Sequence, residues 1–204
     1  MAERGAYTKG VAKREEIVNA ALAVVARVGY SRTTIREVAS AVGLSQAGLL
    51  HYFGSKEQLF VEILSRRDEV DRRAFSGRNE ADDPAADAAE STVRLVRHNA
   101  DVPGLVQLYS RFSSEAAEPD HAAHDYFRDR YLETRTLLED SIGRMREAGR
   151  LRSELSTEQL AVIMVALIDG LQMQWMYDPA VDMADHVAHL WSLITSPADP
   201  DGPN

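Results

Sequence analysis

The stretch TTIREVASAVGLSQAGLLHYFGSKEQLF, residues 33–60, contains three signals for the start of a helix. Thr34 and Ser55 are each followed three residues later by Glu or Gln, the pattern of a capping box, and Ser45 can also cap a helix by accepting a backbone N–H. Gly43 stands where a left-handed turn residue is needed between the first two helices. The stretch therefore predicts two short helices and the start of a longer one.

An apolar stripe over 13–29 predicts a helix before this stretch, and the helix that starts at Ser55 continues past Ile63. Two short helices joined by a glycine turn inside such a bundle indicate a helix-turn-helix. Leu44, Leu49 and Phe53 are the residues best placed to bury the second short helix. Its other side chains are predicted to face outward.

The outward face of the second short helix carries groups suited to DNA. Small residues at Ala47 and Gly48 let the helix approach a groove closely, and Gln46 can pair with an adenine edge. His51 can donate to a base or a phosphate, while the Tyr52 hydroxyl can reach a phosphate oxygen. Other readings stay open, since Tyr52 could be a core aromatic and the paired threonines at 33 and 34 could act only as caps.

The same stretch resembles the DNA-binding domain of the TetR family of bacterial transcriptional regulators, over about residues 13–60. The paired threonines, the Gly43 turn, the H-Y-F end of the second helix and the S-K-E start of the next have the family's spacing. Gly48 and Leu50 depart from it, because the family usually has threonine and tyrosine there, and both usually touch phosphate. The predicted DNA-contacting residues are Thr33, Thr34, Arg36, Ser45, Gln46, Ala47, Gly48, Leu50, His51, Tyr52 and Lys56.

Charge divides the chain in the same way. Residues 1–56 hold eight basic and four acidic residues, a net charge of +4. Because the whole chain has a net charge of −9, residues 57–204 carry −13. Such asymmetry suggests a basic end that meets a polyanion. The 204 residues contain no cysteine, which excludes disulfides and thiolate metal sites, and no signal peptide or apolar run of membrane-spanning length is predicted. We expect a cytoplasmic protein with no membrane partner.

Helical patterns continue to the end of the chain, so the predicted fold is all-α: an N-terminal helix-turn-helix domain and a larger C-terminal helical bundle. The acidic segment 76–91 is predicted to be a connector, and Pro103-Gly104 and Glu118-Pro119-Asp120 to be turns. Further helices are predicted over 90–100, 104–117, 121–149, 157–177 and 182–194, and Thr157 could cap the helix over 157–177. The predicted domains are 1–56 with its N-terminal arm, 57–196 for effector binding and dimerisation, and a disordered tail at 197–204.

The 157–177 helix is apolar on more than one flank, which exceeds what one small bundle needs. A homodimer would bury the excess about a twofold axis, and the resemblance implies dimerisation through the last two helices. The alternative is a core helix of a single protomer. The predicted interface residues are Leu160, Met164, Leu167, Leu171, Val187, Leu190 and Ile194.

Aromatic and thioether side chains in the middle helices suit an apolar ligand cavity, although plain core packing is the alternative for each. Asp169 lies inside an apolar helix, where it needs either a ligand cation or an Arg or Tyr from a neighbouring helix. The candidate ligand-binding residues are Leu105, Tyr109, Phe112, Tyr126, Met164, Asp169 and Met173. Histidine pairs at 121/124 and 186/189 have possible metal spacing without a second cluster, so no metal, cofactor or catalytic site is expected.

These patterns favour a ligand-responsive transcriptional regulator that binds a palindromic operator as a homodimer, and the resemblance implies that it is a repressor. A DNA-binding regulator without an effector is the main alternative. An all-α enzyme is the third possibility, and it lacks any recognisable assembly of a nucleophile with a base.

Overall fold

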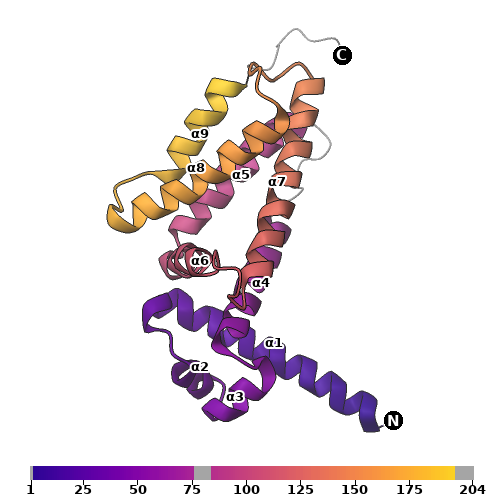
Figure 1. Ribbon diagram of the computed structural model, residues 1–204, viewed down its shortest axis with the longest axis vertical. Coiled ribbons are helices and arrows are strands. Elements are labelled where there is room, and N and C mark those ends of the chain that lie inside the picture. Colours follow the sequence, from indigo (N-terminus) through magenta and orange to yellow (C-terminus); the bar gives the residue numbers. More distant parts are fainter. Residues whose placement is uncertain (1, 76–83, 196–204) are drawn as a thin grey trace. The chain divides into compact units, whose positions relative to one another are not determined.

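The computed structural model describes residues 2–75 and 84–195, with side chains over 10–73 and 88–195. Within those ranges the regular elements are helices, and the β-structure is one isolated bridge between Leu151 and Thr195. The all-α prediction is confirmed (Figure 1). The helices are α1 (Ala2–Val28), the 3-10 turn η1 (Tyr30–Arg32), α2 (Ile35–Ala41), α3 (Gln46–Phe53), α4 (Lys56–Phe75), α5 (Pro84–Ala100), α6 (Pro103–Glu115), α7 (His124–Glu147), α8 (Thr157–Tyr177) and α9 (Met183–Ile194).

The predicted caps around the helix-turn-helix are present. Thr34 forms a complete capping box, accepting from the Glu37 N–H and donating its own N–H to the Glu37 carboxylate. The hydroxyls of Ser45 and Ser55 accept from backbone N–H groups three residues on. These side chains satisfy N–H groups that have no partner inside the helix, so the sequence itself fixes where each helix starts.

Three predicted boundaries were wrong. The cap of α8 is Ser156, not Thr157, because Ser156 and Gln159 form the reciprocal capping box. Pro103 and Gly104 are the first residues of α6, not a turn, since proline fits the first helical position, where no N–H bond is needed. The predicted connector 76–91 is helical from Pro84, for the same reason and because alanines follow it. Its earlier part and the tail at 197–204 lie outside the described residues.

The first helix also differs from its prediction. The apolar stripe of 13–29 marks only the buried part of α1, whereas the helix begins at Ala2. The predicted N-terminal arm is therefore a helical extension of α1. Periodicity missed it because no apolar stripe at helical spacing occurs in the sequence before Lys13.

The chain forms two compact units. One contains residues 1–72 and 102–127, and the other contains residues 73–101 and 128–204. The helices of the helix-turn-helix and α6 therefore share one unit, although the sequence suggests a domain boundary at residue 56.

The core of the first unit forms where α1 packs against the helix-turn-helix, α4 and α6. Ile17 and Val25 of α1, Leu49 of α3 and Ile63 of α4 are fully buried. Gly104 brings α6 very close to α1, because a Cβ atom there would lie 2.1 Å from the Val25 carbonyl oxygen. Backbone therefore meets backbone at this crossing.

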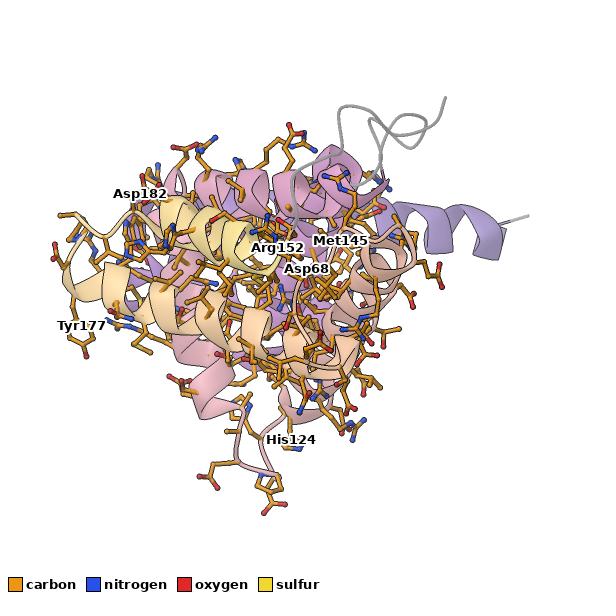
Figure 2. All side chains as sticks on the ribbon, turned by 90° about the horizontal axis from the view of Figure 1, so that it is seen from above. Asp68, His124, Met145, Arg152, Tyr177 and Asp182 are labelled. Carbon is orange, nitrogen blue, oxygen red and sulfur yellow. The ribbon has the colours of Figure 1, made fainter. Side chains whose placement is uncertain are left out.

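The core of the second unit is built from α5, α7, α8 and α9, with Met145, Met164 and Trp191 among its buried side chains. Helix α8 is long and apolar enough to cross a membrane by length and composition, with only 28% of its most apolar window buried. Its exposed apolar residues include Val162 and Met173, and at its end Tyr177 projects from the ribbon with 86% of its surface exposed (Figure 2). More than one flank of α8 is thus apolar, and only part of that surface is covered within the protomer.

Candidate nucleic-acid interface

The turn between α2 and α3 has the geometry of a helix-turn-helix. Gly43 adopts φ +67°, the left-handed conformation predicted for it. The N–H of Leu44 donates to the Ala39 carbonyl at 2.9 Å, which closes the end of α2. Lys13 of α1 also donates to the Val42 carbonyl at 3.3 Å, so the turn is tied to the first helix. These bonds set the direction in which α3 leaves the turn.

Helix α3 has one face toward the core and one away from it. Leu49 and Phe53 are buried as predicted, while Leu44 before the helix is only half-buried. On the other side Gln46, Ala47 and His51 are exposed. A helix of eight residues is long enough to present these side chains to a groove.

The remaining outward residues of α3 are half-buried. Gly48 lies against the cap, since a Cβ there would be 3.2 Å from the Ser45 hydroxyl oxygen. The Leu50 side chain is partly covered, and the Tyr52 ring lies 6.1 Å from the ring of His51. Gly48, Leu50 and Tyr52 are thus only partly accessible, whereas Gln46, Ala47 and His51 are exposed.

Of the paired threonines, only the second is accessible. Thr33 is 2% exposed, and its hydroxyl donates to the Gly29 carbonyl at 2.8 Å. Its side chain stabilises the η1 turn and is too buried to contact DNA, so the prediction of a DNA contact at Thr33 was wrong. Thr34 and Arg36 are exposed at the start of α2.

Lys56 at the start of α4 lies beside two aromatic rings. Its Nζ is 5.7 Å from the ring centre of Tyr30 and 5.0 Å from that of Phe60. Cation–π attraction favours this position of the ammonium group. The pKa of the next residue, Glu57, is lowered, mainly by a hydrogen bond from its own backbone N–H. Partial burial opposes this shift, and the Ser55 hydroxyl and the charges of His121 and Lys56 add to it.

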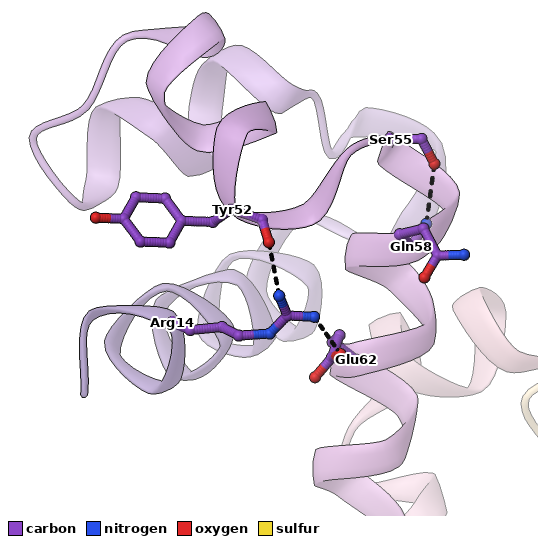
Figure 3. A network of polar contacts seen from close by, with 5 residues as sticks. All are labelled: Arg14, Tyr52, Ser55, Gln58 and Glu62. Carbon is purple, nitrogen blue, oxygen red and sulfur yellow. Dashed lines mark hydrogen bonds and ion pairs between the residues drawn. The ribbon is translucent and has the colours of Figure 1, made fainter. Parts of the chain in front are cut away.

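Sequence reasoning did not single out Arg14 of α1. Together with Gly10, Val11, His51 and Tyr52 it lines an open groove of about 430 Å³ beside the end of α3. Its guanidinium contacts α3 and α4 (Figure 3). No sequence signal marked it, because these contacts join residues 38 and 48 positions apart.

The candidate ligand residues are divided between the two units. Leu105, Tyr109 and Phe112 are buried in the first, where the rings of Tyr109 and Phe112 each contact the ring of Phe127. The Tyr126 hydroxyl donates to the Asp68 carboxylate at 3.0 Å. Met164 is buried in the second unit, and Met173 is exposed.

Asp169 has the protein partner that the sequence favoured. The Tyr131 hydroxyl of α7 donates to its carboxylate at 2.7 Å. The prediction of a pairing with Arg or Tyr from a neighbouring helix is therefore confirmed.

The histidine pairs make local contacts. Nδ1 of His121 accepts from the Ala123 N–H, and Nδ1 of His124 lies 2.9 Å from the Ala116 carbonyl oxygen. In α9, Nδ1 of His186 lies 2.7 Å from the Asp182 carbonyl oxygen. Over the described ranges no cluster of three His, Asp or Glu side chains is placed to hold a metal ion.

The predicted dimer residues are mostly part of the protomer core. Leu160, Met164, Leu171 and Val187 are at most 4% exposed in the isolated chain, so their side chains have no free surface for a partner. The prediction of these four residues as dimer contacts was therefore wrong. Leu167, Leu190 and Ile194 are half-buried against the same core.

Two family models match this chain. Residues 17–63 match the model of bacterial regulatory proteins of the tetR family, and residues 103–195 match that of the C-terminal part of BetI-type transcriptional repressors. The HTH-type transcriptional regulator BetI of Rhizobium meliloti is 31% identical over 172 residues, which cover 78% of this chain and 75% of BetI. The chain belongs to the TetR family. It is thus a regulator of the helix-turn-helix type, in a family that binds DNA operators.

Other transcriptional regulators resemble it over most of their length. The repressor Rv1474c of Mycobacterium tuberculosis is 25% identical, over 78% of this chain and 80% of its own. A transcriptional regulator from Saccharomonospora viridis, solved in complex with choline, has a TM-score of 0.70 and 25% identity, over 90% of this chain and 98% of its own. A TetR regulator from Haloarcula marismortui has a TM-score of 0.76 at 19% identity, over 91% and 100%, which supports the fold alone.

Proposed function

We propose that this protein is a cytoplasmic transcriptional repressor that binds a palindromic operator as a homodimer and is released by a small-molecule effector. The observation that carries the proposal is the division of α3, with Leu49 and Phe53 in the core and Gln46, Ala47 and His51 exposed on the other side. Residues 1–56 would read DNA, and residues 57–196 would bind the effector and the second protomer.

The outward face of α3 supports direct reading of a major groove. Gln46 can form two hydrogen bonds with an adenine edge, and the small side chain of Ala47 permits close approach. His51 and Tyr52 can donate to phosphate or base, and Lys56 adds a positive charge whose position the neighbouring rings favour. The remaining proposed contacts are Thr34, Arg36, Ser45, Gly48 and Leu50.

Dimerisation is supported by the uncovered flank of α8. Val162, Ala166, Met173 and Tyr177 follow one another at helical spacing and are all exposed. Apolar surface of this kind gains free energy when a second copy covers it. We propose this stripe as the contact surface of α8, with the half-buried residues Leu167, Leu190 and Ile194 at its border.

For the effector we propose an organic cation. The Saccharomonospora viridis neighbour was solved with choline, and the candidate ligand residue Tyr126 lies beside the carboxylate of Asp68. Aromatic faces and carboxylates are the groups that recognise quaternary ammonium. The alternative of a regulator without an effector predicts no response to such a ligand.

The DNA-reading face is tested with a duplex that the wild-type protein selects from a random-sequence library. His51→Ala and Tyr52→Ala should each weaken binding by about tenfold or more, because each removes a base or phosphate contact. His98→Ala, which removes an exposed histidine from α5, is the matched control and should bind normally. Unchanged affinity in both α3 variants would exclude this face as the DNA contact.

The effector is tested by titrating choline into the complex of wild-type protein and selected duplex. Choline should release the DNA and raise the melting temperature of the free protein, since a ligand that binds the folded state stabilises it. If choline changes neither, the proposal of a cationic effector of this class fails, and the regulator without an effector is favoured.

A further inference from the structure

The Arg14 side chain of α1 makes three contacts around the end of α3 (Figure 3). One terminal nitrogen donates to the Tyr52 carbonyl oxygen at 2.6 Å, and the other donates to the Glu62 carboxylate at 2.5 Å. Its Cζ atom lies 4.7 Å from the ring centre of Phe53. A single guanidinium therefore joins α1, α3 and α4.

The Tyr52 carbonyl needs such a donor. The last four carbonyl groups of a helix lack a partner within it, and α3 ends at Phe53. The N–H of Gly54 donates to the Leu50 carbonyl, so the chain reversal at Gly54 leaves the Tyr52 carbonyl to Arg14. A cation at this place also interacts favourably with the negative end of the helix dipole.

The last turn of α3 is held by Phe53 and by Arg14. The helix has only eight residues, and Leu49 and Phe53 are its buried anchors. The Phe53 ring lies against the Arg14 guanidinium, and the Tyr52 carbonyl is bonded to it, so the last turn is held on two sides. That turn carries His51 and Tyr52, two of the proposed DNA contacts.

We propose that Arg14 is a positioning residue for DNA recognition, which fixes the orientation of the last turn of α3 and thereby the direction of His51 and Tyr52. The inference rests on the proposed function. Glu62 contributes to the same positioning, because its carboxylate orients the planar guanidinium so that the other terminal nitrogen points at the Tyr52 carbonyl.

A direct contact between Arg14 and a phosphate is the competing explanation, since Arg14 lines the open groove beside His51 and Tyr52. The two explanations make different predictions for a lysine at this position. Lysine keeps the charge that a phosphate needs, but its point-like ammonium cannot replace a planar group with fixed, paired donors. Glu62→Gln separates them as well, because it leaves the charge of Arg14 intact.

The experiment compares Arg14→Lys, Glu62→Gln and wild type for binding to the library-selected duplex and to a scrambled duplex of equal length. Asp129→Asn is the control, because it weakens an exposed ion pair with Arg128 in α7, a helix that the inference does not involve. We expect Arg14→Lys to lower the ratio of selected to scrambled affinity by about tenfold and Glu62→Gln by about threefold, while the control leaves it unchanged. Melting curves and circular dichroism establish that each variant is folded at the assay temperature.

A ratio within twofold of wild type in folded Arg14→Lys would overturn the inference, as would an equal loss on both duplexes. If Arg14→Lys does not fold, Glu62→Gln decides alone, and an unchanged ratio in that variant would overturn it. A phosphate contact would instead show in Arg14→Gln as a salt-dependence slope smaller by about 0.9, with normal binding by Glu62→Gln. Failure of the wild type to select any duplex would reject the proposed function itself.

Discussion

Tyr30, in the η1 turn before the helix-turn-helix, contacts both α6 and α4. Its hydroxyl donates to the Glu115 carboxylate of α6 at 2.9 Å, and its ring meets the ring of Phe60 edge-on at 5.2 Å. Burial, followed by the hydrogen bond and negative charge of Glu115, raises the pKa of Tyr30 to about 12. The protonated hydroxyl is therefore favoured by the folded state.

Tyr30→Phe should make the protein less stable at pH 9 by about 1 kcal/mol, because it removes one hydrogen bond to a carboxylate. A pKa that is raised on folding contributes stability below pH 10, where tyrosine is also protonated in the unfolded chain, and this contribution falls between pH 10 and 12. The difference in unfolding free energy between wild type and Tyr30→Phe should thus shrink from pH 9 to pH 11 in urea titrations. A difference independent of pH would contradict the assignment.

At the scale of elements, the sequence predicted those features that depend on neighbouring residues. The capping box at Thr34, the left-handed Gly43 and the burial of Leu49 and Phe53 follow from spacings of a few residues, and each is confirmed. The close crossing of α6 and α1 at Gly104 could not be predicted this way. Nothing near Gly104 in the sequence indicates that Val25 lies against it, and next to proline it looked like a turn residue.

Gly104→Ala should destabilise the first unit by about 1–3 kcal/mol, the usual cost of forcing an extra carbon into a packed site. The new Cβ would meet the Val25 carbonyl oxygen at 2.1 Å and that of Ala26 at 3.0 Å, and backbone atoms cannot rotate away as a side chain can. Urea unfolding measures the loss. Gly143→Ala in α7 is the control, because its Cβ has no neighbour within 4 Å, and the helical preference of alanine should leave it as stable as wild type or more so. Equal stability of Gly104→Ala and wild type would show that α6 does not depend on this crossing.

At the scale of the whole molecule, the sequence showed that α8 has more apolar surface than one bundle needs, but not which side faces inward. The stripe with Leu160, Met164 and Leu171 packs into the protomer's own core, and Val162 and Met173 lie on the exposed flank. Both stripes repeat at helical spacing. Hydrophobic periodicity cannot separate them, because the choice depends on where α5 and α9 pack.

If the exposed flank of α8 is the dimer contact, charged residues placed there should separate the protomers. The double variant Val162→Glu and Met173→Glu should convert a homodimer into monomers of 22.6 kDa, because two symmetry-related copies would bring like charges together in an apolar contact. Sedimentation equilibrium measures the mass, and circular dichroism checks that the helices remain.

Leu132→Glu with Leu137→Glu on α7 is the matched control, since both leucines are more than half exposed and lie outside the proposed contact. The control should remain dimeric, and only the α8 variant should lose affinity for a palindrome while keeping weak binding to a half-site, because a monomer presents one recognition helix. A wild type that sediments as a monomer, or an α8 variant that remains dimeric, would contradict this surface.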